Sequence, residues 1–145
     1  MEHQIETVLR GGQFKKLVTS QLAGIRKKYG LRRVEMEILY FLSKCGENNT
    51  SKDIAHYLEM NKGHISQAVE NLCKQGYLTA VTDVHDRRYV HFLVTDKGKV
   101  FNEDMSELWG NMLQKIFDGI TEEEMAVFKA VALKMGENMD RMINE

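Results

Sequence analysis

Apolar residues recur every three to four positions over most of the chain, the spacing of one face of an α-helix. In the first half of the chain this pattern predicts four helices, over about residues 4–29, 34–44, 50–58 and 61–75. Gly11-Gly12 is expected to weaken or kink the first helix, and Gly30 to end it. Thr50 and Asp53 form a capping box for the third helix, and Asn61 can cap the fourth.

The periodicity then changes to that of strands. Residues 77–81 and 89–94 are rich in Val, Tyr, Thr and Phe, which favour extended backbone. The polar and charged residues 82–88 connect them, so the two segments predict a β-hairpin with an extended loop.

Two long helices are predicted after the hairpin. The first begins near Thr95 and continues to Ile116, and the second opens at a capping box over residues 121–124 and carries apolar residues as far as Met142. The expected fold class is therefore mainly α with one small β-hairpin (α+β).

Composition limits the kind of protein. The chain has 145 residues and is 43% hydrophobic, enough for a packed core. No apolar run approaches the roughly 20 residues of a membrane span, and the first residues are polar, so we expect a cytoplasmic protein without a membrane segment. Cys45 and Cys73 are far apart and form no CxxC motif, and we interpret them as ordinary thiols.

Charge is distributed unevenly although the net charge is only −1. Residues 1–33 carry eight basic and two acidic side chains, a net +6, whereas residues 100–145 carry four basic and ten acidic ones, a net −6. Residues 50–98 are balanced, with six of each sign. Any attraction of the middle segment for phosphate would therefore need help from the basic cluster at residues 26–33.

The third and fourth predicted helices make a helix-turn-helix. We call the second of them, residues 61–75, the reader helix. Its apolar side holds Ile65, Ala68, Val69 and Leu72, and its opposite side holds Gly63, Gln67, Glu70 and Lys74, flanked by His64, Ser66 and Asn71. Amides can pair with adenine edges and hydroxyls can hold phosphate, so this polar side suits a DNA major groove. An ordinary amphipathic helix with a solvated face fits the same pattern.

The hairpin that follows favours the DNA interpretation. A helix-turn-helix with a two-stranded hairpin directly after it is a winged helix, and Arg87-Arg88 would lie near the tip of the wing. An arginine there can enter the narrow, electronegative minor groove. The alternative is a solvated loop with two exposed arginines.

The stretch from Leu31 to Gly98 resembles the MarR family of winged-helix regulators. The matching features are Leu31 ahead of Ile38-Leu39, Ile54-Ala55, Leu72 followed by Gly76-Tyr77-Leu78, the wing segment 83–88, and Thr95-Asp96-Lys97-Gly98. The long flanking helices extend the resemblance to most of the chain.

The resemblance implies a winged helix-turn-helix with long N- and C-terminal dimerisation helices, divided at residues 1–30, 31–98 and 99–145. It implies that Asp86 braces the wing, that Arg88 enters the minor groove and that Arg87 contacts the backbone. The full set of expected DNA-binding residues is Lys62, Gly63, His64, Ser66, Gln67, Asn71, Lys74, Asp86, Arg87 and Arg88. Val84 and His85 depart from the proline and arginine that many relatives carry, which makes this wing less basic.

The apolar stripes of the first and the last two helices exceed what a small winged helix can bury, and a homodimer would cover them. Relatives commonly bind small aromatic or phenolic anions near the dimer helices. The residues that we assign as candidates for such an effector site are Tyr29, Arg32, Tyr40 and Trp109.

Other functions have less support. There is no phosphate-binding Gly loop, nucleophile elbow or HExxH motif, so we do not expect an enzyme or a cofactor. The histidines (His56, His64, His85 and His91) lack compact ligand spacing, so no metal site is expected. The sequence thus predicts a homodimeric regulator that binds a palindromic duplex operator, and the resemblance to the MarR family implies that it is a repressor. A winged-helix adaptor for proteins and a metal-responsive regulator remain the alternatives.

Overall fold

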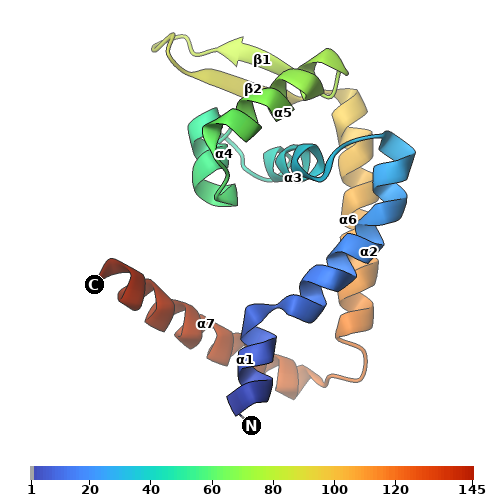
Figure 1. Cartoon of the computed structure of the whole chain (residues 1–145), viewed down its shortest axis with the longest axis vertical. Coiled ribbons are helices and arrows are strands. Elements are labelled where there is room, and N and C mark those ends of the chain that lie inside the picture. Colours follow the sequence, from blue (N-terminus) through green and yellow to red (C-terminus); the bar gives the residue numbers. More distant parts are fainter. Residues whose placement is uncertain (1) are drawn as a thin grey trace. The chain divides into compact units, whose positions relative to one another are not determined.

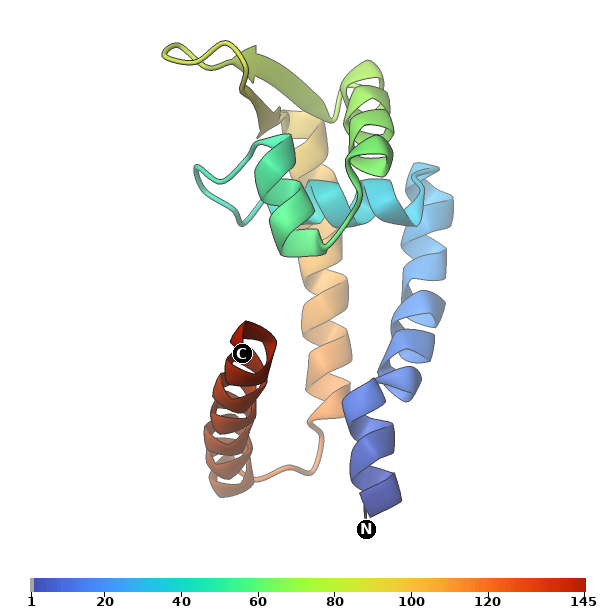
Figure 2. The same ribbon diagram turned by 60° about the vertical axis from the view of Figure 1, so that its left-hand side comes forward.

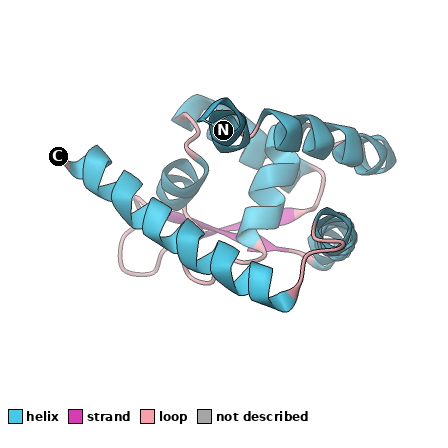
Figure 3. Ribbon diagram, turned by 90° about the horizontal axis from the view of Figure 1, so that it is seen from below, coloured by secondary structure: helices cyan, strands magenta, loops and turns pink. Residues whose placement is uncertain are grey.

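The computed structural model describes residues 2–145, apart from the side chains of Glu2, His3 and Thr7. Its elements in chain order are α1 (Glu2–Arg10), α2 (Gly12–Tyr29), α3 (Arg33–Leu42), α4 (Ser51–Leu58), α5 (Lys62–Lys74), β1 (Leu78–Thr82), β2 (Val90–Val94), α6 (Asp96–Ile116) and α7 (Glu122–Asn144) (Figure 1). The chain divides into two compact units, one up to Trp109 and one from Gly110. The predicted fold class is confirmed: helices dominate, and the two strands form one small antiparallel sheet (Figure 3).

A weakening or kink was expected at Gly11-Gly12, and the structure has a complete break there that separates α1 from α2. Gly11 has a φ of 63° and Gly30, which ends α2, has a φ of 66°. Glycine adopts this left-handed backbone without the steric cost that a Cβ brings. The long first helix expected over residues 4–29 is therefore two helices.

Side-chain caps begin three of the helices as the sequence predicts. The Thr50 hydroxyl accepts a hydrogen bond from the Asp53 backbone N–H, and the Asp53 carboxylate accepts one from that of Thr50. Asn61 caps α5 by accepting from the backbone N–H of His64 at 2.9 Å. Thr121 and Glu124 form the same reciprocal box at α7. The starts of α4, α5 and α7 are therefore each fixed by a side chain.

The core of the first unit lies among α3, α4, α5 and the start of α6. Its most deeply buried apolar residues, each at most 1% exposed, are Leu31, Met36, Ile38, Leu39, Ile54, Ile65, Ala68, Leu72 and Phe101. The apolar side of α5 faces inward as predicted, and α5 lies beside both α3 and α4 (Figures 1 and 2). This packing leaves the opposite side of α5 on the surface.

The hairpin leads from α5 into α6. Its register pairs Leu78 with Val94 and Thr82 with Val90. The bounds of both strands lie within one residue of the predicted ranges 77–81 and 89–94 at each end. The Thr95 backbone N–H donates to the Tyr77 carbonyl at 3.0 Å, so α6 starts directly against the beginning of the wing.

In the second unit α7 has no buried residue. The exposed large apolar residues on it are Val127, Phe128, Val131, Leu133, Met139, Met142 and Ile143. Within this unit the rings of Phe117 and Phe128 lie 6.5 Å apart. None of the described helices is both long and apolar enough to span a bilayer.

The close contact between α6 and the wing requires a glycine at position 98. A Cβ placed there would lie 2.6 Å from the Tyr77 carbonyl oxygen and 2.7 Å from Val94 Cγ1. We expect Gly98→Ala to destabilise the protein by about 1–3 kcal/mol, because backbone must move to accept the methyl group.

Gly110→Ala is the matched control on the same helix, since a Cβ at Gly110 meets nothing within 4 Å. It should leave stability unchanged or raise it by about 1 kcal/mol. Urea unfolding of the two variants measures both effects, and equal stabilities would contradict the packing described for Gly98.

Candidate nucleic-acid interface

The reader helix α5 presents one polar side to solvent. Glu59, in the turn after α4, adopts a left-handed backbone with a φ of 51°, and Asn61 then starts α5. The α5 residues expected to contact DNA that are exposed are Lys62, Gly63, His64, Ser66, Gln67 and Lys74. They lie opposite the buried face, so the helix offers small, amide, hydroxyl and basic groups together.

Asn71 differs from the other expected contacts. It is half-buried, and its Nδ2 donates to Glu35 Oε1 of α3 at 2.6 Å. Its amide therefore anchors α5 to α3. The buried Glu35 was missed by sequence reasoning, because Arg32 at the N-cap position is not one of the Ser, Thr, Asp or Asn residues that make a capping box recognisable.

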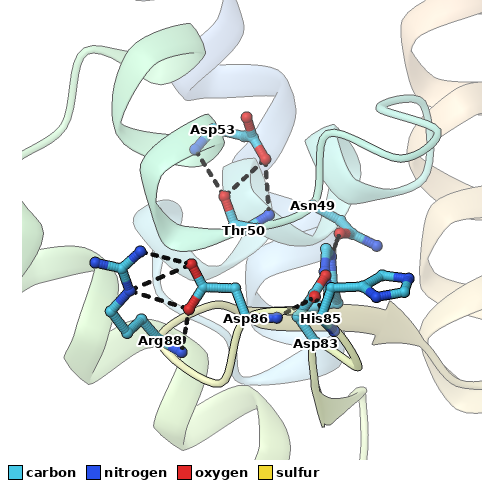
Figure 4. A network of polar contacts seen from close by, with 8 residues as sticks. Asn49, Thr50, Asp53, Asp83, His85, Asp86 and Arg88 are labelled. Carbon is cyan, nitrogen blue, oxygen red and sulfur yellow. Dashed lines mark hydrogen bonds and ion pairs between the residues drawn. The ribbon is translucent and has the colours of Figure 1, made fainter.

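The loop of the wing is organised by two carboxylates (Figure 4). Asp83 Oδ1 accepts from the backbone N–H groups of His85 and Asp86, both at 2.8 Å. The Asp86 carboxylate accepts from Arg88 Nε at 3.0 Å and Nη2 at 2.8 Å, and from the Arg88 backbone N–H at 3.0 Å. The Arg88 side chain nevertheless remains 85% exposed. The wing thus presents a guanidinium whose direction is set by Asp86, with the exposed Arg87 next to it.

The base of the wing is tied to the loop before α4. His91 Nε2 lies 2.7 Å from Asp83 Oδ2, and His91 Nδ1 lies against Asn49 Oδ1. The Asn49 carbonyl also accepts from the Phe92 backbone N–H at 3.0 Å. A continuous chain of contacts therefore runs from the loop before α4 through His91 to the wing loop. No spacing pattern in the sequence predicts this cluster, because Asn49 is more than 30 residues from its partners in the hairpin.

The electrostatics of the wing follow from these contacts. Hydrogen bonding to His91, and then to the backbone N–H groups of Asp86 and His85, lowers the pKa of Asp83 to about 2. Hydrogen bonds from Arg88 lower the pKa of Asp86. Both carboxylates are therefore ionised at neutral pH, which the fork to Arg88 requires.

These shifts predict acid sensitivity of the wing. A carboxyl whose pKa is lowered in the folded state stabilises the fold above its unfolded pKa, and that stabilisation is lost as pH falls towards the folded value. We expect the Asp83 contribution to be complete above about pH 4 and to disappear towards pH 2.

Thermal unfolding of Asp83→Asn should therefore show a lower Tm than the wild type at pH 7 and a smaller difference near pH 2.5. Asp140→Asn on α7 serves as control, since Asp140 is exposed and its carboxylate makes no hydrogen bond within residues 2–145. An Asp83→Asn variant with an unchanged Tm at pH 7 would contradict the role assigned to this carboxylate.

The four candidate effector residues do not share one cavity. Tyr40 and Trp109 line a cavity of about 510 Å³ between α2, α3, α4 and α6, whereas Arg32 lines one of about 460 Å³ between α2 and α3. Tyr29 packs edge-on against Phe101 with ring centroids 5.0 Å apart, and its hydroxyl donates to Asp104. The Trp109 Nε1–H is buried without an acceptor among the described residues.

The remaining reactive groups show no built site. Cys45 and Cys73 are free and half-buried, and burial raises the pKa of both thiols, which lowers their nucleophilicity. Among residues 2–145 no group of three or more His, Cys, Asp or Glu side chains is placed to hold a metal ion.

Comparisons with known proteins agree with this geometry. Residues 31–98 match the family described as winged helix DNA-binding domain. The chain is 28% identical over 126 residues to the HTH-type transcriptional regulator YpoP of Bacillus subtilis, covering 87% of this chain and 86% of the relative. It is 26% identical over 102 residues to the HTH-type transcriptional regulator BilQ of Clostridioides difficile, covering 68% of each.

Solved structures share the fold. FabT of Streptococcus pneumoniae, crystallised in complex with DNA, superposes with a TM-score of 0.78 at 23% identity, over 98% of this chain and 99% of that one. A MarR protein from Peptoclostridium difficile gives a TM-score of 0.76 at 24% identity, over 93% and 88% of the two chains. The resemblance inferred from the sequence is thereby confirmed at the level of fold and domain.

Proposed function

We propose that the chain is a winged helix-turn-helix transcriptional regulator of the MarR type, which acts as a homodimeric repressor on a palindromic duplex operator. The observation that carries this proposal is the pairing of an exposed polar side on α5 with a wing arginine held by a carboxylate. An enzyme is not supported, since the relatives and structural neighbours are regulators.

In this proposal α5 lies in the major groove. Ser66 and Gln67 project from its exposed side, where an amide can form two hydrogen bonds with an adenine edge and a hydroxyl can bind a phosphate. Lys62 and Lys74, near opposite ends of the helix, are placed for phosphates on either side of the groove. These contacts combine positioning on the backbone with recognition of bases.

The wing supplies the second set of contacts. Because Asp86 holds Arg88 through Nε and Nη2, the guanidinium loses little conformational entropy when it enters a minor groove. The narrow minor groove of A·T-rich DNA concentrates negative potential and attracts such a group. Arg87 extends the positive charge towards the flanking phosphates.

Fluorescence anisotropy on duplex DNA from the region upstream of its own gene tests the proposal. We expect saturable binding that exceeds binding to a scrambled duplex and weakens as salt rises. No binding to either duplex at low salt would contradict the proposal and favour the protein-binding adaptor.

Two substitutions in the wing separate the effect of the orientation of the Arg88 side chain on DNA binding from the effect of net charge. Arg88→Ala should weaken binding by roughly 5- to 150-fold, the usual value of one base-reading arginine, without lowering Tm.

Asp86→Ala removes a negative charge but frees the Arg88 side chain. DNA binding should therefore also weaken if the orientation of Arg88 by the Asp86 carboxylate contributes to affinity. Stronger binding by Asp86→Ala would show that only net charge matters and would contradict the proposed brace. Arg141→Ala, an exposed arginine of α7, is the control.

A homodimer accounts for the apolar surface that the single chain exposes. Ile5, Val8 and Leu9 on α1 are each more than half exposed, as are Phe128 and Met142 on α7. Monomeric proteins rarely leave patches of this kind open to water. The opposite net charges of the two ends of the chain favour contact between the N-terminal part of one protomer and the C-terminal part of its partner.

We further propose that the cavity beside Trp109 takes the effector, a small aromatic or phenolic molecule. Its walls include Leu22, Met36, Tyr40 and Met105, and the unsatisfied Trp109 Nε1–H offers one donor. The cavity lies between α2, on the side of the dimer helices, and α3 of the winged helix. A molecule bound there can therefore change the position of α2 relative to α3.

Trp109 is the single tryptophan and reports directly on this cavity. Titration with 4-hydroxybenzoate should change its emission saturably, whereas acetate, which has the charge without the ring, should not. Tyr40→Ala should weaken the response and Tyr89→Ala, on the exposed wing, should not. Equal responses to the two anions would contradict the assignment.

A further inference from the structure

A cation from outside the reader helix lies on the surface of α5. Arg32, directly before α3, lines a shallow cavity of about 340 Å³ together with Gln67, Glu70, Asn71 and Lys74 of α5. We propose that Arg32 of each protomer binds a backbone phosphate of the operator and that the buried Glu35 presents it there. The inference rests on the proposed function and adds a contact that neither α5 nor the wing supplies.

The buried carboxylate of Glu35 holds the Arg32 guanidinium from the side of the core. The Glu35 side chain is 1% exposed, and its Oε1 accepts from Arg32 Nε at 2.9 Å and lies 2.8 Å from Nη2. Its Oε2 accepts from the Arg32 backbone N–H at 2.9 Å. Burial alone would raise the pKa of Glu35, but the hydrogen bonds from Arg32 and Asn71 together lower it. The carboxylate is therefore ionised, and the guanidinium has a fixed, charged partner.

Asn71 sets the position of this pair relative to the reader helix. Its Nδ2 donates to the same Oε1 that binds the guanidinium, at 2.6 Å. Glu35 thus joins Arg32 to the C-terminal end of α5 through one shared atom. Because Arg32 and Glu35 lie together at the start of α3, the Glu35–Asn71 hydrogen bond fixes the position of this pair relative to the reader helix.

The free edge of the guanidinium faces outward. Glu35 engages Nε and Nη2, and Nη1 has no acceptor within residues 2–145. The Arg32 side chain is 48% exposed although its partner is almost fully buried. A planar guanidinium with one edge fixed and the other open is well suited to bind a phosphate oxygen.

The charges around Arg32 permit a phosphate to approach. The negative charge of Glu35 lies beneath the guanidinium, away from solvent. Glu70 is the other carboxylate in the cavity, and it pairs with Lys74 at 3.3 Å across an exposed surface. Such exposed pairs contribute little free energy, so Lys74 can turn to the phosphate at small cost.

The contact also explains how a nearly neutral winged helix can hold DNA. Residues 50–98 have six basic and six acidic side chains, and phosphate contacts normally supply much of the affinity. Arg32 comes from the basic segment before α3, and the fold brings it to the α5 surface. The basic cluster near residue 30 therefore reaches the interface through one residue.

The salt dependence of operator binding tests this contact. Each phosphate contact changes the slope of log K against log salt by about 0.9, so losing one per protomer should make the slope of Arg32→Gln shallower by about 2. Arg33→Gln removes the same charge one residue later, but Arg33 pairs with Glu37 and Thr19 and does not line this cavity. Its slope should match the wild type.

A folding defect must be separated from a lost contact. Because Arg32→Gln removes the cation beside a buried carboxylate, the double variant Arg32→Gln/Glu35→Gln is measured alongside it, with Tm as the check on folding. A wild-type slope in a folded double variant would overturn the assignment of Arg32 and leave the proposed function intact. Failure of the wild type to bind either duplex would instead count against the proposed function itself.

Discussion

The placement of α5 depends on the burial of its apolar side. Ile65, Ala68 and Leu72 have no exposed surface, and they pack against α3 and α4. A rotation of α5 about its axis would expose these residues and bury charged ones, at a cost of several kcal/mol for the apolar groups alone. Burial of the apolar side of α5 therefore both stabilises the core and directs the polar side of the helix outward.

Polar side-chain contacts then further constrain the positions of α5 and of the wing, beyond what the apolar packing determines. The Arg32–Glu35–Asn71 cluster joins α3 to the C-terminal end of α5, and the Asn49–His91–Asp83 cluster joins the loop before α4 to the wing. Both clusters are partly shielded from water, where an unpaired partner is costly. They relate the reader helix and the wing to one scaffold, which matters because in the proposed function the two enter neighbouring grooves together.

Much of the fold could be predicted from the sequence because its signals are local. Period-3.6 apolar spacing marked the helices, Thr50, Asn61 and Thr121 marked three helix starts, and β-branched and aromatic residues marked the hairpin. Gly11-Gly12 also predicted a weakened or kinked helix, and the left-handed backbone of Gly11 divides that helix completely.

The polar clusters could not be predicted, because their partners come together only in three dimensions. Asn71 was expected to face DNA, and its side chain is also the link to Glu35; 36 residues separate the two. The candidate effector residues Tyr29, Arg32, Tyr40 and Trp109 show the same limit. Tyr40 and Trp109 line one cavity, Arg32 lines another, and Tyr29 hydrogen-bonds to Asp104. Side-chain type indicated the chemistry, and only the fold determined which groups meet.

In the proposed complex, two copies of α5 enter successive major grooves while the wings reach the flanking minor grooves. Hydroxyl-radical footprinting of the protein on DNA from upstream of its own gene tests this most directly. We expect a two-fold symmetric pattern in which the backbone bordering two major-groove segments is protected, the segments being centred about 10 base pairs apart or a multiple of that spacing, with further protection at the flanking minor grooves. A single asymmetric protected segment, or uniform cleavage along the duplex, would contradict it.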